Sequence, residues 1–164
     1  MIFLETDRLR LRNVEEKDIE IMFDYRNNEL CARYQRGQTK DREGLKKLID
    51  ERKNGRISLQ DAFILAIALK ATDEMVGEVV VMPKGKTISM GYTISYKYHR
   101  RGYAFEMLSA LTELLHQQFP AQEFICLVEP ENTASIELLK KLGYQDMGYV
   151  EKIDSQMFGK WVME

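Results

Sequence analysis

The chain is poor in the residues that build disulfide frameworks, metal sites and membrane spans. It has two cysteines, two histidines and three prolines among 164 residues. Cys31 and Cys126 stand alone in the sequence, so we expect no zinc motif and no disulfide framework, and reduced thiols are typical of a cytoplasmic protein. The longest apolar run, 62–69, is far shorter than the roughly 20 residues that cross a bilayer.

An excess of charge of either sign is also missing. The formal net charge is -2, which gives no reason to expect direct binding to nucleic acid or to a membrane. Charged residues begin at Glu5, too early for a signal peptide. The length and a hydrophobic content of 45% favour a single domain over 1–164 with a sizeable core. The oligomeric state stays open, with a homodimer among the alternatives.

Hydrophobic periodicity predicts an α/β (α+β) fold built on about seven strands. A helix over 103–119 lies between two apolar strands, as in a crossover between parallel neighbours, and the other strands look antiparallel. We therefore expect a mixed, mostly antiparallel sheet with helices on both faces. The predicted strands are 8–12, 63–70, 75–82, 87–96, 124–128, 145–153 and 155–163, and the predicted helices are 15–28, 41–53, 103–119 and 132–142.

The segment 90–108 carries the most information about function. It reads as a strand, then a basic turn with Arg100, Arg101 and Gly102, then a helix. The first N–H groups of a helix have no partner within it, and its N-terminus carries roughly half a positive charge. Such a junction binds phosphate, so a phosphate-bearing ligand is expected; the alternative is that both arginines are solvated loop charges.

Two motifs carry a resemblance to a known family. The segment His99-Arg-Arg-Gly-Tyr-Ala104 is similar to the signature Gln/Arg-x-x-Gly-x-Gly/Ala of the GNAT N-acetyltransferases, with His99 as the departure. Asn132 and Ser135, followed by Lys-Leu-Gly-Tyr144, resemble the family's second block. The opening 6–12, together with Met90-Gly-Tyr92, resembles the RimJ/RimL subgroup, which includes ribosomal-protein N-terminal acetyltransferases.

The resemblance implies acetyl-CoA as the cofactor and CoA as a product. Its pantetheine arm would lie between two parallel strands that splay apart, and glycine at the junction would let the backbone approach the pyrophosphate. No metal is implied. The residues expected to bind the cofactor are Ile94, Ser95, His99, Arg100, Arg101, Gly102, Tyr103, Ala104, Phe105 and Asn132. Asn132 is also expected to cap its helix.

The resemblance also suggests how the thioester would be attacked. Many relatives use a tyrosine as the general acid where this chain has Leu139, and the RimJ/RimL pattern suggests Ser135 instead. The alternative for Ser135 is a hydrogen bond to its own helix backbone. Ser89 stands where many relatives have a glutamate, so the base stays open. Glu78, Glu151 and Asp154 are candidates, each expected at the surface, and Tyr144 is expected to pack in the core.

The implied reaction transfers an acetyl group to a primary amine. The RimJ/RimL likeness and the weak base machinery favour a protein N-terminal α-amine, because an amine of pKa near 8 is roughly 10% neutral at pH 7. A small-molecule amine and a non-catalytic acyl-CoA-binding domain remain alternatives. The segment 31–56 carries nine Lys/Arg and four Asp/Glu, a charge of +5, which either attracts an acidic acceptor or is a solvated surface.

Overall fold

A single sheet of eight strands organises the protein, in the order β1-β2-β3-β4-β5-β6-β8-β7. The computed structural model describes residues 1–35 and 38–163. All neighbouring strands pair antiparallel except β5 and β6, which are parallel. The strands are β1 (Ile2–Glu5), β2 (Leu9–Asn13), β3 (Phe63–Leu69), β4 (Met75–Lys84), β5 (Thr87–Ile94), β6 (Glu123–Val128), β7 (Gln145–Val150) and β8 (Ser155–Lys160).

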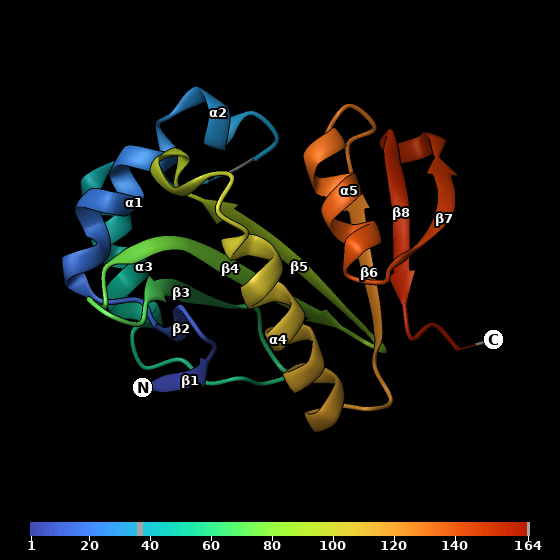
Figure 1. Ribbon diagram of the computed structural model, residues 1–164, viewed down its shortest axis with the longest axis horizontal. Helices are drawn as coiled ribbons and strands as arrows, with labels where there is room; N and C mark the ends of the chain where they lie inside the picture. The colour runs from blue at the N-terminus through green and yellow to red at the C-terminus, as the bar shows by residue number, and fades with distance from the viewer. Residues whose placement is uncertain (36–37, 164) are drawn as a thin grey trace.

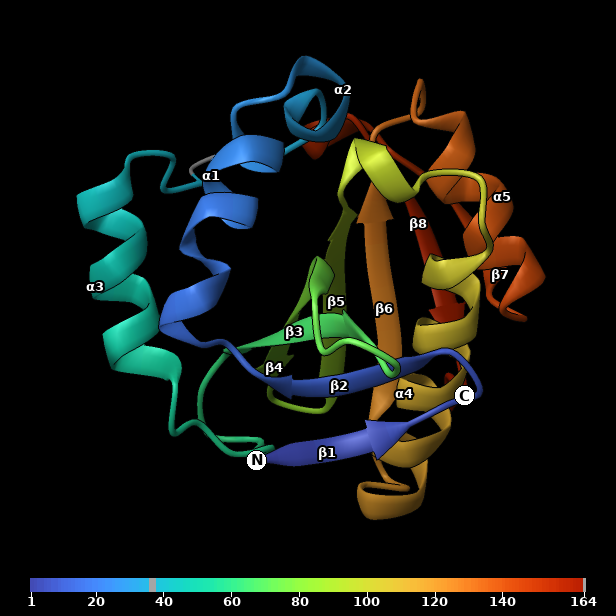
Figure 2. The same ribbon diagram turned by 60° about the vertical axis from the view of Figure 1, so that its left-hand side comes forward.

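Helices cover both faces of the sheet (Figures 1 and 2). They are α1 (Ile19–Arg26), α2 (Glu29–Ala32), α3 (Arg42–Arg52), α4 (Tyr103–Gln118) and α5 (Thr133–Lys141). Leu108 and Leu111 of α4 pack with Leu139 of α5 in the larger core cluster, whereas Met22 of α1 and Leu45 of α3 belong to a second cluster. Within the part of the chain that the structure describes, no helix is long and apolar enough to cross a membrane.

The predicted architecture is confirmed, with one strand more than expected. The added strand, β1, has only Ile2, Phe3 and Leu4 as apolar residues, too few for a period-two pattern to show. Phe3 and Leu4 pack against the larger core cluster. The strand therefore depends on contacts that form only when the chain is folded.

The predicted helix over 15–28 is broken into shorter pieces. A 3₁₀ turn (Glu16–Asp18) leads into α1, which ends at Arg26, and α2 starts afresh at Glu29. Asn28 causes the restart, because it has extended backbone angles and its side chain accepts hydrogen bonds from the N–H groups of Leu30 and Cys31. An asparagine at such a position favours a new helix start over continuation.

The parallel pair in the middle of the sheet is short. Only Thr87 with Glu123 and Ile88 with Phe124 are in register, and beyond these two pairs the strands diverge (Figure 1). The rest of β5 remains paired with β4 as far as Ile94. The sheet is therefore continuous at one end of β5 and split at the other, as expected for the splayed pair.

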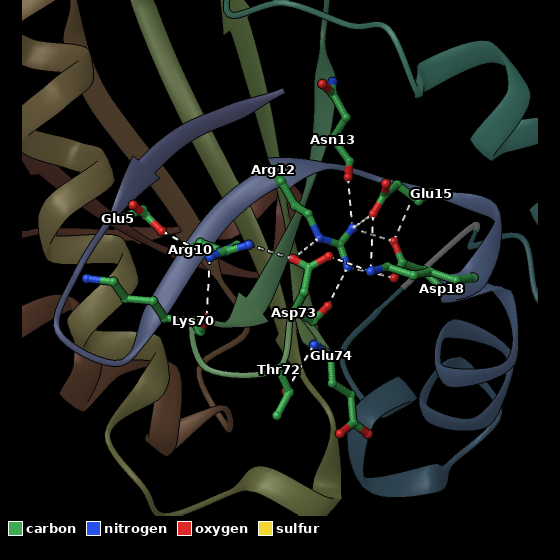
Figure 3. Close-up of polar contacts among 11 residues, drawn as sticks. Glu5, Arg10, Arg12, Asn13, Glu15, Asp18, Lys70, Thr72, Asp73 and Glu74 are labelled. Atoms are coloured by element: carbon green, nitrogen blue, oxygen red, sulfur yellow. Dashed lines mark hydrogen bonds and ion pairs between the residues drawn. The ribbon is translucent and has the colours of Figure 1, made fainter.

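Buried ion pairs tie the N-terminal strands to the first helix (Figure 3). Arg12 donates from Nη1 and Nη2 to the two carboxylate oxygens of Asp18, at 2.8 and 2.9 Å, and from Nε to Asp73 at 2.9 Å. The Arg12 and Asp18 side chains are 5% and 2% exposed. Burial alone would raise the pKa of Asp73, but the Lys17 ammonium and the Arg12 charge outweigh it and lower that pKa. The network contributes stability above the usual carboxylate range, and this stability is lost as pH falls through the lowered pKa.

We expect Asp18→Asn to lower the free energy of unfolding by about 2–3 kcal/mol, because buried Arg12 would lose its bidentate partner and keep only the more exposed carboxylates of Asp73 and Glu15. Urea unfolding measures the change. Asp50→Asn is the control, since its pair with Lys53 is exposed and worth less than about 1 kcal/mol. Equal losses in the two variants would contradict a stabilising role for the Arg12 network.

Candidate active site

Two cavities meet where β5 and β6 separate. The first, of about 540 Å³, lies between the diverging strands and reaches the loop before β8. The second, of about 530 Å³, lies at the start of α4. The two share their dividing wall, which consists of Tyr34, Gln35, Tyr92, Asn132 and Ser135. A long ligand can therefore extend from the start of α4 to the gap between the strands.

The second cavity is shaped to hold an anion. Among the described residues, its lining includes Arg100, Arg101 and Lys141 but no Asp or Glu. Arg100 and Gly102 have left-handed backbones, with φ of 64° and 79°, and Gly102 is the N-cap of α4. The free N–H groups of the first helical turn then lie along the cavity wall, where they favour negative charge.

Arg8, in the turn between β1 and β2, links this junction to the first strands of the sheet. Its Nη1 donates to the carbonyl of Arg101 at 2.9 Å, and its Nε pairs with Glu106 at 2.7 Å. The guanidinium also lies 4.6 Å from the ring centre of Tyr103. Glu106 is the acidic residue in the first turns of α4, and its pairing with Arg8 prevents it from opposing an anion there.

The split of the sheet exposes one edge of β5. The carbonyls of Met90, Tyr92 and Ile94 face the same edge of the strand. They accept from side chains instead of from backbone N–H groups of β6. Gln35 Nε2 donates to Tyr92 O at 3.3 Å, and the Cys126 thiol approaches Met90 O at 3.9 Å. Ile94 O lies 2.7 Å from His99 Nε2 and 3.5 Å from the Cys31 thiol. These carbonyls form an edge that a ligand amide could join.

A pair of hydroxyl groups lies in the wall between the two cavities. Tyr92 Oη is 3.0 Å from Ser135 Oγ. Asn132 Oδ1 accepts from the Ser135 N–H at 3.3 Å, which confirms Asn132 as the helix cap. Burial raises the pKa of Tyr92, and the hydrogen bond with Ser135 offsets this only in part. Tyr92 therefore stays protonated at neutral pH and can donate to Ser135.

Most of the residues expected to bind a cofactor line the second cavity. Ile94, Asn132 and the whole stretch from His99 to Phe105 do so. Ser95 is an exception, because it is 2% exposed and lines neither cavity. Its N–H donates to the carbonyl of Val76 at 2.8 Å. Tyr92 and Gln35 were not predicted as site residues, although Tyr92 stands in the Met-Gly-Tyr segment that suggested the subgroup.

The candidate bases lie in different surroundings. Glu78 was expected at the surface, and this was wrong: it is 1% exposed and pairs with Arg26 at 2.7 Å, with Tyr25 also donating to it. Asp154 lines the first cavity and accepts from Tyr149 at 2.6 Å. Glu151 is exposed and outside that lining.

Two further residues considered for catalysis pack in the core. Leu139 and Tyr144 are 6% and 4% exposed and belong to the core cluster, while also lining the first cavity. Across residues 1–35 and 38–163, no three His, Cys, Asp or Glu side chains gather in a way that could hold a metal ion.

The mixed sheet splits at its parallel pair, and the start of α4 lies beside the split. Residues 8–145 match the family model described as the acetyltransferase (GNAT) domain. The chain therefore belongs to the GNAT family and is an acyltransferase, and membership implies the use of acetyl-CoA.

Individual relatives agree with this assignment. The chain is 24% identical over 151 residues to the uncharacterized N-acetyltransferase YnaD of Bacillus subtilis, covering 91% of this chain and 86% of that protein. Among solved structures, a GNAT acetyltransferase from Bacillus anthracis superposes with a TM-score of 0.80 at 20% identity, covering 97% and 96% of the two chains. The Salmonella typhimurium enzyme that modifies the N-terminal serine of ribosomal protein L7/L12 gives 0.79 at 16% identity, covering 99% and 100%.

We expect Glu78→Gln to lower the free energy of unfolding by about 3 kcal/mol, because the Arg26 guanidinium would remain buried without a countercharge. Chemical denaturation measures the loss. Glu20→Gln is a control at an exposed pair with Arg42, where a much smaller loss is expected. An unchanged unfolding midpoint in Glu78→Gln together with lost activity would instead give Glu78 a chemical role.

Proposed function

We propose that this enzyme transfers the acetyl group of acetyl-CoA to the α-amine of a peptide or protein N-terminus. The observation that carries the proposal is the pair of joined cavities, one free of carboxylates at the start of α4 and one between the diverging strands, with Ser135 and Tyr92 in their shared wall. The acceptor class is supported by the ribosomal-protein acetyltransferases among the structural neighbours.

The residues around the second cavity fit a CoA-type cofactor. In this proposal the N–H groups from Arg100 to Phe105 hold the pyrophosphate, and Arg100, Arg101 and Lys141 balance its charge. The carbonyl edge of β5, from Tyr92 to Ile94, accepts the amides of the pantetheine arm as a strand would. Gln35 and His99 must release those carbonyls as the arm enters. Asn132 contacts the arm from the start of α5.

Ser135 serves as the general acid in this scheme. Acetyl-CoA supplies an activated thioester, and the reaction needs a proton for the departing thiolate. In this scheme the Tyr92 O–H donates the hydrogen bond to Ser135 Oγ, 3.0 Å away, so that the serine O–H is free to point into the first cavity. This role for Ser135 would replace the tyrosine that the family resemblance places at the position of Leu139.

An α-amine suits this site because part of it is already neutral near pH 7, so it does not need a strong general base. About a tenth of such an amine is neutral at pH 7, against well under 0.1% of a lysine side chain. Glu78 is paired with Arg26, and Asp154, which lines the first cavity from the loop before β8, accepts a hydrogen bond from Tyr149. A small-molecule amine or a domain without turnover remains the alternative, and acetylation of a peptide panel decides between them.

Gly102→Val should weaken acetyl-CoA binding at least about tenfold. A β-branched residue cannot hold φ of 79° without a cost of about 1–2 kcal/mol, so the loop would turn its N–H groups away from the cavity. The fold should survive, because the nearest atom to an added Cβ, Arg8 Nη2, is 3.5 Å away. Thermal melting with acetyl-CoA, CoA and NAD measures the effect, since a ligand at a hundred times Kd adds about 2.7 kcal/mol and several degrees.

The matched control is Gly85→Val, in the turn between β4 and β5. Gly85 has φ of 59° and open space around it, so the backbone strain is similar but the cavity is remote. It should melt earlier while keeping the full shift with acetyl-CoA. If Gly102→Val also keeps the shift, the cofactor site has been misplaced.

Ser135→Ala should lower kcat about a hundredfold while leaving the affinity for acetyl-CoA unchanged, because only the proton donor is removed. Thiol release with an amine acceptor measures kcat, and thermal shift measures binding. Thr133→Ala is the control, since Thr133 lies in the same helical turn, bonds only the Glu131 carbonyl, and is outside both cavities. Equal kcat in the two variants would remove Ser135 from the chemistry.

A further inference from the structure

A third cavity lies on the other face of the sheet. It has a volume of about 330 Å³ and is bounded by α1, α3 and the strands β3 to β5. Its walls are largely apolar, from Leu48, Phe63, Ile64, Val80 and Met82. The cavity is large enough for one or two amino-acid side chains but is separated by the sheet from α4 and α5.

This cavity joins the other two at one point. Gln35 and Tyr92 line all three cavities, and Gly91 lines the first and the third. Because glycine has no side chain, only the backbone of β5 separates the first cavity from the third at Gly91. A ligand in the third cavity can therefore present a group to the wall that holds Ser135.

One positive charge in the third cavity is not balanced. Arg26 lines it, but Glu78 neutralises that guanidinium. Arg52 also lines it and is half-buried; its Nη1 donates to the carbonyl of Ala62 at 3.0 Å. Within residues 1–35 and 38–163, no carboxylate lies within ion-pair distance of Arg52. An apolar cavity with one uncompensated guanidinium favours a ligand with an apolar body and a carboxylate.

The strand register gives the spacing such a ligand needs. Val80 pairs with Gly91 at the junction, whereas Arg52 is anchored at Ala62, one residue before the Phe63–Val81 pair. Gly91 and Ala62 are therefore two residues apart along the strands and two strands apart across the sheet, which is about 12 Å. In a free α-amino acid the amine lies only about 2.5 Å from the carboxyl carbon, which is too short. In a peptide, an acidic side chain within the first two residues places its carboxyl carbon roughly 5–9 Å from the amine, and the ion pair with the guanidinium adds about 3 Å.

We propose that the third cavity takes an acidic side chain within the first two residues of the peptide acceptor, and that Arg52 determines this specificity. The inference rests on the proposed function, because it assumes that the amine is acetylated beside Ser135. The amine lies at the Gly91 junction, the apolar part of the acceptor packs between Phe63 and Val80, and the carboxylate pairs with Arg52.

Matched peptides test the proposal. Four acceptors with free N-termini and amidated C-termini carry Glu or Gln at position one or at position two, with alanine at the other. The wild-type enzyme should acetylate the Glu peptide of at least one pair about tenfold better in kcat/KM, mainly through KM. Arg52→Gln should abolish that preference, and Arg52→Glu should reverse it. Lys53→Gln, at an exposed neighbour outside the cavity, should keep the wild-type ratio.

The outcomes separate the two proposals. Acetylation of all four peptides with equal kcat/KM would overturn the specificity inference and leave the proposed function intact. A preference for Glu that survives in Arg52→Gln, with the variant folded by thermal melting, would also overturn it. Failure to acetylate any peptide, with acetyl-CoA still bound, would overturn the proposed acceptor class and this inference with it.

Discussion

Backbone carbonyls need hydrogen-bond partners inside a protein, and the divergence of β5 from β6 leaves three of them without a neighbouring strand. The fold satisfies them with side chains: Gln35 on Tyr92, His99 and Cys31 on Ile94, and the Cys126 thiol near Met90. Thiols are weak hydrogen-bond donors. An incoming ligand can displace one amide and one imidazole from these carbonyls more easily than it could displace a paired strand. The split edge is thus stable enough to fold and open enough to accept another chain of amides. The cavities, the dividing wall and the position of Ser135 all follow from this interruption of the sheet.

The parts of the site that could be predicted from the sequence are local. Gly102 stands at the start of a strongly periodic helix, and only glycine readily takes the left-handed conformation found there. Asn132 lies directly before a second helix, and its capping bond to Ser135 spans three residues. The parallel pair could be predicted because parallel strands need a long crossover connection, usually a helix, and α4 lies between the two apolar strands. In each case the relevant contact lies within one turn or one connection.

The parts that could not be predicted depend on contacts between distant segments. Glu78 alternates with apolar residues in β4 and gave no sign of burial, because Tyr25 and Arg26 come from a helix more than fifty residues earlier. Gln35 reaches Tyr92 across 57 residues, and Arg8 reaches Glu106 across 98. The strand β1 is held by pairing with β2 and by the packing of Phe3 and Leu4. A periodic pattern carries no information about which distant partner a polar side chain will meet.

The lack of carboxylates among the described residues that line the second cavity also has a kinetic consequence. The segment 31–56 carries +5 and the chain as a whole carries -2, so the remainder carries -7. Against that negative background, Arg100, Arg101 and Lys141 form a localised positive region at the mouth of a concave surface, and such a region concentrates field lines. An anionic ligand is then drawn to one place on the molecule. Its rate of encounter falls as ionic strength rises and the Debye length shrinks, while contacts made after desolvation change much less.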